Sequence, residues 1–369
     1  MRRLLNRRLG ALVDALPEAP SPDPAQALDD ALALGLLGLG LPEDLGGAGG
    51  FTDLVVAHEE LGHGLAAPLA TTLTLAGRLL LHTSGGADRD RSLAELAAGR
   101  RLAAPALDEG EPRSGIATTV TANGDAVQLD GRECRVAGGR QVDELLVLAR
   151  RTESEAVLMR VPTDRPELEW TPAQSAADIP HWSVTFHGVS LPRDAVLGPV
   201  AEPALASYHD ESAVLAAARL VGGGRAVLER TIAHVRTREQ FDRPIGTFQA
   251  VQHQLADVAT ELDATGLAVA QAGWAVEAGA TPTQTARLAA TALLAARLAA
   301  RRATLVAHQL HGGMGFVLDS PMHLWSARAI ADPTVPMDRR QLLDRLAEAL
   351  GVTAEGVVVP PDHRVAAGA

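Results

Sequence analysis

The hydrophobic period of this chain changes twice, and this feature constrains its fold more than any other. In the first quarter of the sequence, apolar residues recur every three or four positions, as they do in amphipathic helices. The next stretch has short runs of alternating apolar and polar residues, which favour β-strands, and helical spacing then returns in long segments. We therefore predict an α+β fold. The predicted units are a helical domain at residues 1–100, a β domain at 101–202, a helical domain at 203–351 and a tail at 352–369.

The second and third units each carry a further signal of their architecture. Asn123-Gly124 and Asp130-Gly131 stand between alternating runs, and such dipeptides are typical of turns that join antiparallel strands. The middle unit is thus predicted to be an antiparallel barrel or sandwich. The long segments after residue 203 are rich in alanine, which favours a tightly packed bundle of helices.

Composition excludes several classes of function. The formal charge of −12 disfavours nucleic acid or an anionic membrane as a partner, because the protein as a whole would repel either one. All 33 basic residues are arginines, so chemistry that needs a lysine, such as a Schiff base, is excluded. The single Cys134 cannot form an intrachain disulfide and predicts a reducing compartment, for which the cytoplasm is the default. The basic N-terminal segment lacks the apolar core of a signal peptide.

Two stretches of the last unit differ in composition from the alanine-rich segments around them. The first is "RTREQFDRPIGTFQAVQHQLAD" and the second is "HQLHGGMGF", which interrupts an alanine-rich helical segment. Taken singly, each has an ordinary structural explanation: an arginine at a helix end can offset the helix dipole, and paired glycines can cap a helix. His308 and His311 lack a carboxylate at matching helical spacing, so we predict packing or capping for them and no metal site.

These two stretches in this order resemble the acyl-CoA dehydrogenase family, as do "LGLPEDLGGAGG", "HEELGHGLA" and "FHGVSLPRDAVLG". The resemblance covers nearly the whole chain. It implies an N-terminal helical domain, a middle antiparallel β domain and a C-terminal four-helix bundle. It also implies that the cofactor is FAD, whose ADP half is bound by the two C-terminal stretches across a subunit boundary in a homo- or heterotetramer.

The residue types in those stretches fit the implied cofactor. An arginine is planar and always charged, so it can bind a pyrophosphate through two parallel hydrogen bonds. Glutamines both donate and accept, as adenine and ribose require, and a phenylalanine offers a flat apolar face. Glycines lack Cβ atoms and let backbone N–H groups approach the phosphates. The implied cofactor-binding residues are Arg238, Gln240, Phe241, Gln249, Gln309, Gly312 and Gly313. The triple glycine at 222–224 lies within a helical segment and is predicted to allow close helix packing.

The catalytic base of this family is a carboxylate that removes the α-proton of an acyl-CoA thioester. Most members are expected to place it near Pro336 of this chain, where Asp338 two residues later is predicted to cap a helix instead. A minority place it near Ser212, so the adjacent Glu211 is the candidate base; its alternative role is an exposed carboxylate at a helix start. Asp210 corresponds to an aspartate near the pantetheine arm of CoA.

The β unit departs from the family pattern in two stretches. Around "LDEGEPRSG" and "GRECRVAGG", Glu133 replaces a basic residue and Arg135 replaces the aromatic residue that backs the flavin ring. Glu133 is predicted to pair with a neighbouring group.

Two functional hypotheses follow. In the first, the protein is an FAD-dependent acyl-CoA dehydrogenase that desaturates a thioester between its α and β carbons and passes electrons to an electron-transfer flavoprotein or a similar acceptor. In the second, it is a non-catalytic partner subunit that completes the FAD site of a catalytic homologue, as in mixed assemblies that degrade sterol side chains. Flavin-dependent acyl chemistry other than desaturation is a further alternative on the same fold.

Overall fold

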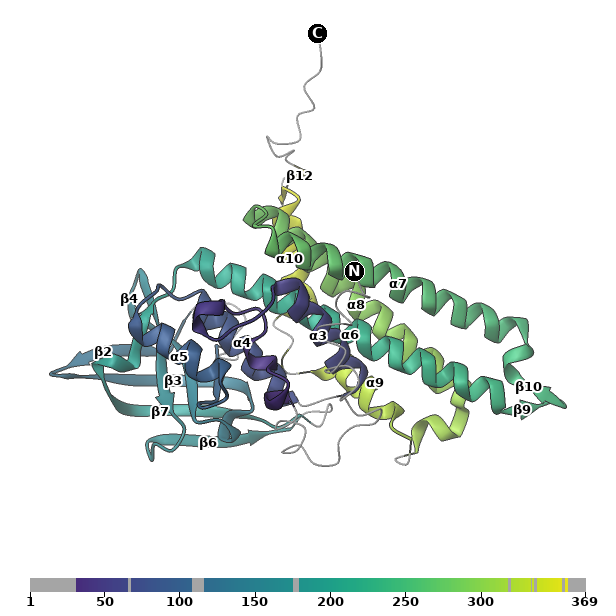
Figure 1. The fold of residues 1–369 in the computed structure, drawn as a ribbon, viewed down its shortest axis with the longest axis horizontal. Helices are drawn as coiled ribbons and strands as arrows, with labels where there is room; N and C mark the ends of the chain where they lie inside the picture. Colours follow the sequence, from purple (N-terminus) through teal and green to yellow (C-terminus); the bar gives the residue numbers. More distant parts are fainter. Residues whose placement is uncertain are drawn as a thin grey trace, which may run out of the picture.

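The computed structural model describes residues 31–357, with gaps at 66–67, 108–115, 175–178, 318–319, 333, 335–336 and 354–355. The described part confirms the predicted fold class, because helices precede and follow a middle β domain. Figure 1 shows the strands at one end of the molecule and the long helices extending away from them. No helix among the described residues is long and apolar enough to cross a membrane.

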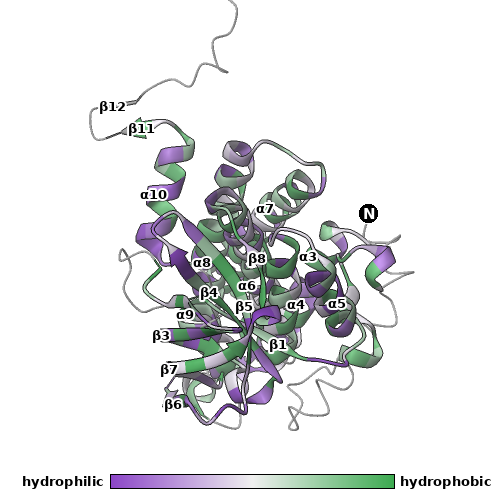
Figure 2. Ribbon diagram, turned by 90° about the vertical axis from the view of Figure 1, so that its left-hand side faces the viewer, coloured by the Kyte–Doolittle hydropathy of each residue, from purple (hydrophilic) through white to green (hydrophobic). Residues whose placement is uncertain are grey.

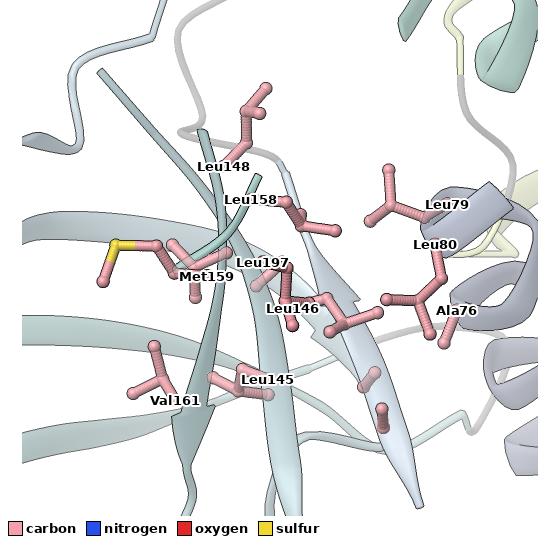
Figure 3. Packing of buried hydrophobic residues seen from close by; sticks show 14 of the residues in the cluster. Ala76, Leu79, Leu80, Leu145, Leu146, Leu148, Leu158, Met159, Val161 and Leu197 are labelled. Carbon is pink, nitrogen blue, oxygen red and sulfur yellow. The ribbon is translucent and has the colours of Figure 1, made fainter. Parts of the chain in front are cut away.

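The first helical region packs directly on the sheet. It contains short 3₁₀ turns at Leu36–Gly38 and Glu43–Leu45 and the helices α3 (Phe51–His63), α4 (Pro68–Leu81) and α5 (Ala87–Ala97). Figure 3 shows Ala76, Leu79 and Leu80 of α4 facing leucines of the strands in one hydrophobic core. The apolar spacing of α4 places these residues on one side of the helix, which explains why α4 lies flat against the sheet.

The middle domain is one eight-stranded sheet with the order β6-β7-β3-β2-β4-β5-β8, and β1 pairs with β4. Its strands are β1 (Ala103–Ala106), β2 (Thr119–Asn123), β3 (Ala126–Ala137), β4 (Glu144–Thr152), β5 (Glu155–Pro162), β6 (Leu168–Ala173), β7 (His181–Pro192) and β8 (Val196–Pro199). Most neighbouring pairs are antiparallel, as predicted, but β4 runs parallel to both β1 and β2. Other elements separate β1 and β2 from β4 in the chain, so no hairpin forces either pair to be antiparallel.

The two predicted turns of this domain have different outcomes. Gly124 lies in the tight connection that joins β2 to β3, with Asn123 paired to Ala126. The prediction of a turn at Asp130-Gly131 is wrong, because β3 continues through it with a shift in register. Gly131 has φ 151° there, and a Cβ atom on it would lie 2.6 Å from Thr118 Cα. Glycine therefore serves a bulge and a close backbone approach at this position.

The last helical region is a bundle around one long helix. Its helices are α6 (Glu202–Thr237), α7 (Gln249–Glu277), α8 (Pro282–His311), α9 (Met322–Ala331) and α10 (Arg339–Ala349). Figure 2 shows α6 lying among α3, α7 and α8. Two-residue strands form the pairs β9–β10 (Glu239–Gln240 with Arg243–Pro244) and β11–β12 (Val352–Thr353 with Gly356–Val357). The second pair lies in the segment predicted as a tail.

The close packing predicted for the triple glycine is confirmed. A Cβ atom on Gly222 would lie 1.8 Å from the carbonyl oxygen of Glu59 in α3, and one on Gly62 would lie 2.0 Å from the carbonyl oxygen of Arg219 in α6. Helices α3 and α6 thus cross with their backbones almost in contact, and any side chain at these two positions would push them apart.

Candidate cofactor and acyl sites

The two C-terminal stretches that suggested a nucleotide lie next to each other in the structure. His234, one turn before Arg238 at the end of α6, stacks on His311, the last residue of α8, with ring centroids 4.2 Å apart. Burial, the neighbouring His311 and the charge of Arg238 together lower the pKa of His234. Arg238 and Gly312 therefore project from helix ends that meet, although they are far apart in the sequence.

The hairpin after α6 holds Phe241 outward in a strained conformation. Phe241 and Asp242 have φ angles of 55° and 59°, in the left-handed region that non-glycine residues rarely adopt. The paired residues on either side, Gln240 and Arg243, define a two-residue loop of the kind that requires positive φ. Phe241 is 86% exposed, with its ring edge toward Phe248. The loop geometry accounts for the positive φ angles, and it leaves the ring of Phe241 exposed to solvent.

The helix interruption at "HGGMGF" has separate causes at its two glycines. Gly312 is the C-cap of α8 and has φ 59° and ψ −138°. Glycine adopts this conformation readily because it has no Cβ atom. Gly313 has no positive φ, and a Cβ atom on it would have no described neighbour within 4 Å, so nothing in this part of the chain requires glycine there. Gln249 and Gln309 are also exposed. The set leaves an open surface with side-chain donors and exposed backbone at the junction of the two helix ends.

Glu211, the candidate base, lies buried in the third turn of α6. The alternative of an exposed carboxylate at a helix start is wrong, because α6 begins at Glu202 and Glu211 is only 5% exposed. Arg78 Nε donates to its Oε2 at 2.7 Å, and His82 Nε2 lies 3.0 Å from its Oε1. Burial would raise the pKa of Glu211, but His82 and the charge of Arg78 outweigh it and lower that pKa. A carboxylate held in this way is a weak proton acceptor.

Asp210, the candidate contact for CoA, also faces an arginine. Arg345 of α10 donates from Nε to Oδ1 at 2.6 Å and from Nη2 to Oδ2 at 2.5 Å, a bidentate pair. Burial raises the pKa of Asp210 in spite of this pair. The ion pair ties α10 to α6, so a structural role for Asp210 is already visible in the contacts.

The other residues considered for catalysis have local structural roles where they are described. Asp338 accepts from the backbone N–H of Gln341 at 2.8 Å, and Gln341 Oε1 accepts from the N–H of Asp338, so the predicted helix cap is confirmed. Pro336 and most of "LDEGEPRSG" lie outside the described residues. Glu133 is buried and accepts a hydrogen bond from Thr118 Oγ1 at 3.0 Å, which confirms its predicted pairing. The backbone of Arg135 has a φ angle of 50°, in the left-handed region.

A buried charged network that sequence reasoning missed lies where α3, α6 and the segment after α9 meet. Arg219 Nη1 donates to His58 Nδ1 at 3.0 Å, and Arg219 Nη2 donates to Thr334 Oγ1 at 2.7 Å. Asp332 Oδ2 lies 3.7 Å from the same Nη2. The signal was present as single polar residues within apolar helical runs, His58 in "VVAHEEL" and Arg219 in "AAARLVGG". The periodicity of those runs could not pair residues so far apart.

Comparison with known proteins agrees with this fold and these stretches. Residues 1–100 match the model of the acyl-CoA dehydrogenase N-terminal domain, and residues 207–333 match that of the C-terminal domain. The acyl-CoA dehydrogenase IpdE2 of Mycobacterium tuberculosis is 31% identical over 85% of this chain and 82% of its own length. The acyl-CoA dehydrogenase FadE12 of the same organism is 29% identical over 86% of each chain.

Solved structures show the same similarity in three dimensions. The ChsE4-ChsE5 complex from Mycobacterium tuberculosis contains a chain that is 26% identical, with a TM-score of 0.79 over 95% of this chain and 96% of that one. The helical–β–helical architecture and the two adjoining C-terminal stretches thus define a flavoprotein of the acyl-CoA-oxidising class. This chain belongs to the acyl-CoA dehydrogenase family, whose cofactor is FAD.

Proposed function

We propose that the protein is a subunit of an FAD-dependent acyl-CoA dehydrogenase and that its C-terminal unit binds the ADP half of an FAD held mainly by a neighbouring subunit. The observation that carries this proposal is the junction of the α6 and α8 ends, where Arg238, Phe241 and Gly313 are all exposed. Gly313 supports it further, because its lack of a side chain has no explanation within the described part of this chain.

Bound FAD would accept the hydride that leaves the β carbon of the acyl thioester. The residues of this chain would bind and orient the cofactor. Arg238 would neutralise the pyrophosphate with a planar pair of N–H donors, and Gln249 and Gln309 would donate to and accept from the nucleoside. Gly312 and Gly313 would let backbone N–H groups approach a phosphate closely.

The candidate carboxylates favour the partner-subunit form of this proposal. Proton abstraction needs a carboxylate whose pKa is raised and that can reach the α carbon. Glu211 has a lowered pKa between Arg78 and His82, Asp210 is paired with Arg345, and Asp338 caps α10. The similar chain in the ChsE4-ChsE5 complex comes from an assembly of two different subunits. We infer that catalysis in this protein depends on a homologous chain.

A visible absorption spectrum of the purified protein tests the proposal. We expect flavin bands in the protein co-expressed with a homologous subunit, and desaturation of acyl-CoA by that assembly. The absence of flavin in the protein alone and in every co-expressed assembly would overturn the cofactor assignment. Turnover by the protein alone would overturn the dependence on a partner.

Arg238→Ala is the most direct substitution. It removes a charge-assisted interaction typically worth about 1.5–3 kcal/mol, so FAD affinity should fall about ten- to hundredfold, as measured by flavin release during titration. Arg238→Lys should restore part of that affinity, because the charge remains but the planar fork does not. Arg236→Ala, an exposed arginine two residues earlier in α6, is the matched control and should retain FAD.

A further inference from the structure

The junction proposed to bind the cofactor is made of two helix C-termini. Helix α6 ends at Thr237 and α8 ends at His311, and the rings of His234 and His311 stack where these ends meet. The last carbonyl groups of a helix give its C-terminus a partial negative charge, which disfavours an anion. Because two such ends meet here, an anionic ligand needs donors and positive charge from the side chains and turns around them.

Arg238 supplies one positive charge at this junction. It follows the last turn of α6, its side chain is exposed, and its backbone N–H donates to the carbonyl oxygen of His234 at 2.9 Å. Burial, the stacked His311 and then the charge of Arg238 lower the pKa of His234. The arginine and the pair of rings therefore influence one another electrostatically.

The hydrogen bonds of His311 fix which of its nitrogens can meet a ligand. Its Nδ1 lies 2.9 Å from the carbonyl oxygen of Ala307, which can only accept, so Nδ1 carries a proton and donates. In the neutral ring the other nitrogen, Nε2, is then an acceptor and repels a phosphate oxygen. In the protonated ring Nε2 becomes a donor and can form a charge-assisted hydrogen bond with that oxygen. His311 can therefore bind an anion through its ring only after it takes up a proton.

The stacked ring of His234 opposes that protonation until an anion is present. The two ring centroids are 4.2 Å apart and the ring planes differ by 19°. Two positive charges this close repel each other, so the pair takes up protons less readily than two separate rings and titrates as a unit. A phosphate beside the pair supplies the opposite charge and favours the protonated form. Binding of an anion and uptake of a proton are thereby coupled.

The elements packed around the two rings add little further charge where they are described. The turns Gly312–Phe316 (η6) and Ile245–Thr247 (η5) contain no titratable residue. His308, one turn earlier in α8, is engaged with α9, because its Nε2 lies 2.5 Å from Ser326 Oγ. The charged or titratable side chains of the β9–β10 hairpin and of the first turns of α7 are exposed to solvent: Glu239, Asp242, Arg243 and His253. The rings thus respond mainly to each other and to Arg238.

We propose that His311 is a further cofactor-binding residue, which donates from its protonated Nε2 to the pyrophosphate that Arg238 binds, and that His234 is a positioning residue that stacks on it. The inference rests on the proposed function, because it names how that site holds the anionic part of FAD. Binding of FAD then takes up about one proton at the stacked pair.

Titration of FAD into the purified full-length protein freed of flavin, with its partner where one is needed, tests the inference. The bound state holds the proton to a higher pH than the free state, so the extra affinity is present at low pH and is lost as the pH rises. FAD affinity should be about tenfold higher at about pH 6 than at about pH 8. An affinity that does not fall over this range would overturn the inference.

Calorimetry of the same binding reaction counts the protons directly. At about pH 7, in two buffers that differ in ionisation enthalpy, the heats should differ by the amount expected for uptake of roughly 0.5–1 proton per FAD. Heats that are independent of the buffer, or that indicate proton release, would contradict the proposal.

Substitutions assign the proton to His311. His311→Gln places a neutral donor near the position of Nε2, so FAD affinity should become independent of pH. His234→Phe keeps a stacked ring but removes the second charge, so the pH dependence should persist and move to higher pH. His187→Gln, in the strand β7 at the other end of the molecule from the β9–β10 hairpin (Figure 1), is the control and should retain the wild-type pH dependence.

Two results would overturn this assignment. The first is wild-type pH dependence in His311→Gln. The second is loss of proton uptake in His234→Phe, which would place the proton on His234. Should His311→Gln fail to fold, the second measurement still decides.

The same titrations separate this inference from the proposed function. Absence of FAD binding at every pH, with and without a partner, would refute the proposed function and this inference together. FAD that binds with equal affinity across the pH range would refute the role of His311 alone.

Discussion

Glu211 and Arg78 form a buried pair between α6 and α4, and the pair decides what a substitution at Glu211 can reveal. Both side chains are largely buried, at 7% and 11% exposed, and Arg78 also donates to the carbonyl oxygen of Gly40 at 2.8 Å. Removing one partner of such a pair typically costs about 3–5 kcal/mol, because the other charge stays buried and uncompensated. Loss of activity in a single variant would therefore have two explanations.

We expect Glu211→Gln to lower the free energy of unfolding by about 3–5 kcal/mol in chemical denaturation. The double variant Glu211→Gln with Arg78→Met should recover much of this loss, since it removes both charges. Turnover of the assembly should recover with it if the pair is structural. A stable double variant that binds FAD but has no turnover would instead support Glu211 as the catalytic base.

His209 predicts how stability depends on pH. Burial and then the charge of Arg345 lower its pKa to about 4, and its Nδ1 atom is buried with no described partner. The folded protein therefore holds a neutral ring over a range in which the unfolded chain, with a pKa near 6.5, binds a proton. This contribution is fully present above about pH 6.5 and is lost as the pH falls toward about 4.

Replacing the ring should flatten that dependence. His209→Gln should reduce the loss of unfolding free energy between pH 6.5 and 4 by up to about 3 kcal/mol, measured by denaturation at a series of pH values. His253→Gln, at an exposed position of α7, should leave the slope unchanged. An identical pH profile for His209→Gln and the wild-type protein would show that the ring titrates normally.

At the scale of elements, the α3–α6 crossing is the contact most sensitive to a single methyl group. Gly222→Ala would place a Cβ atom 1.8 Å from the Glu59 carbonyl oxygen, so the helices must separate and the cores on either side open. We expect a loss of more than about 2 kcal/mol in unfolding free energy, in the range of overpacked cores. Helix propensity acts in the opposite direction, since alanine is favoured over glycine by about 1 kcal/mol.

Gly266→Ala in α7 is the matched control for this substitution. Its Cβ atom would lie 2.7 Å from Nη2 of Arg225, which is 3.5 Å from Asp263, and the end of a long side chain can shift more cheaply than a backbone. Its stability should stay the same or rise slightly. Equal effects of the two substitutions on thermal unfolding would contradict the close crossing.

At the scale of the whole molecule, the outer faces of α7 and α8 indicate assembly through the bundle. Leu267 and Trp274 of α7 are 74% and 61% exposed, and Leu298 and Leu305 of α8 are 70% and 59% exposed. Each pair is spaced by seven residues, so each lies along one side of its helix. Large exposed apolar residues that line up in this way mark an interaction surface.

We propose that the protein assembles through this surface, as a tetramer, and we expect Leu298→Glu with Leu305→Glu to reduce the mass measured by light scattering. The helical content should stay the same, because both side chains are exposed in the single chain. Leu343→Glu in α10, at a position 43% exposed, serves as the control. A tetramer that persists in the double variant would exclude this surface as the assembly contact.

The amino-acid sequence by itself indicated the order of helical, β and helical regions, close helix packing at the triple glycine, the cap at Asp338 and the resemblance to the family. Each of these depends on periodicity or on neighbours within a few residues, which a linear pattern records. It also indicated that Arg238 and Gly312 belong to one site, but through the order of two family motifs and not through geometry.

The tertiary structure alone decided which distant side chains meet. Glu211 is 133 residues from Arg78, and Arg219 is 161 residues from His58. Moving one position along a helix turns a side chain by about 100°, so a small difference in register separates a buried ion pair from an exposed carboxylate. The parallel β1–β4 pair and the bulge at Gly131 likewise depend on which strands lie side by side. These contacts follow from how whole helices and strands pack, and a local sequence pattern does not contain that information.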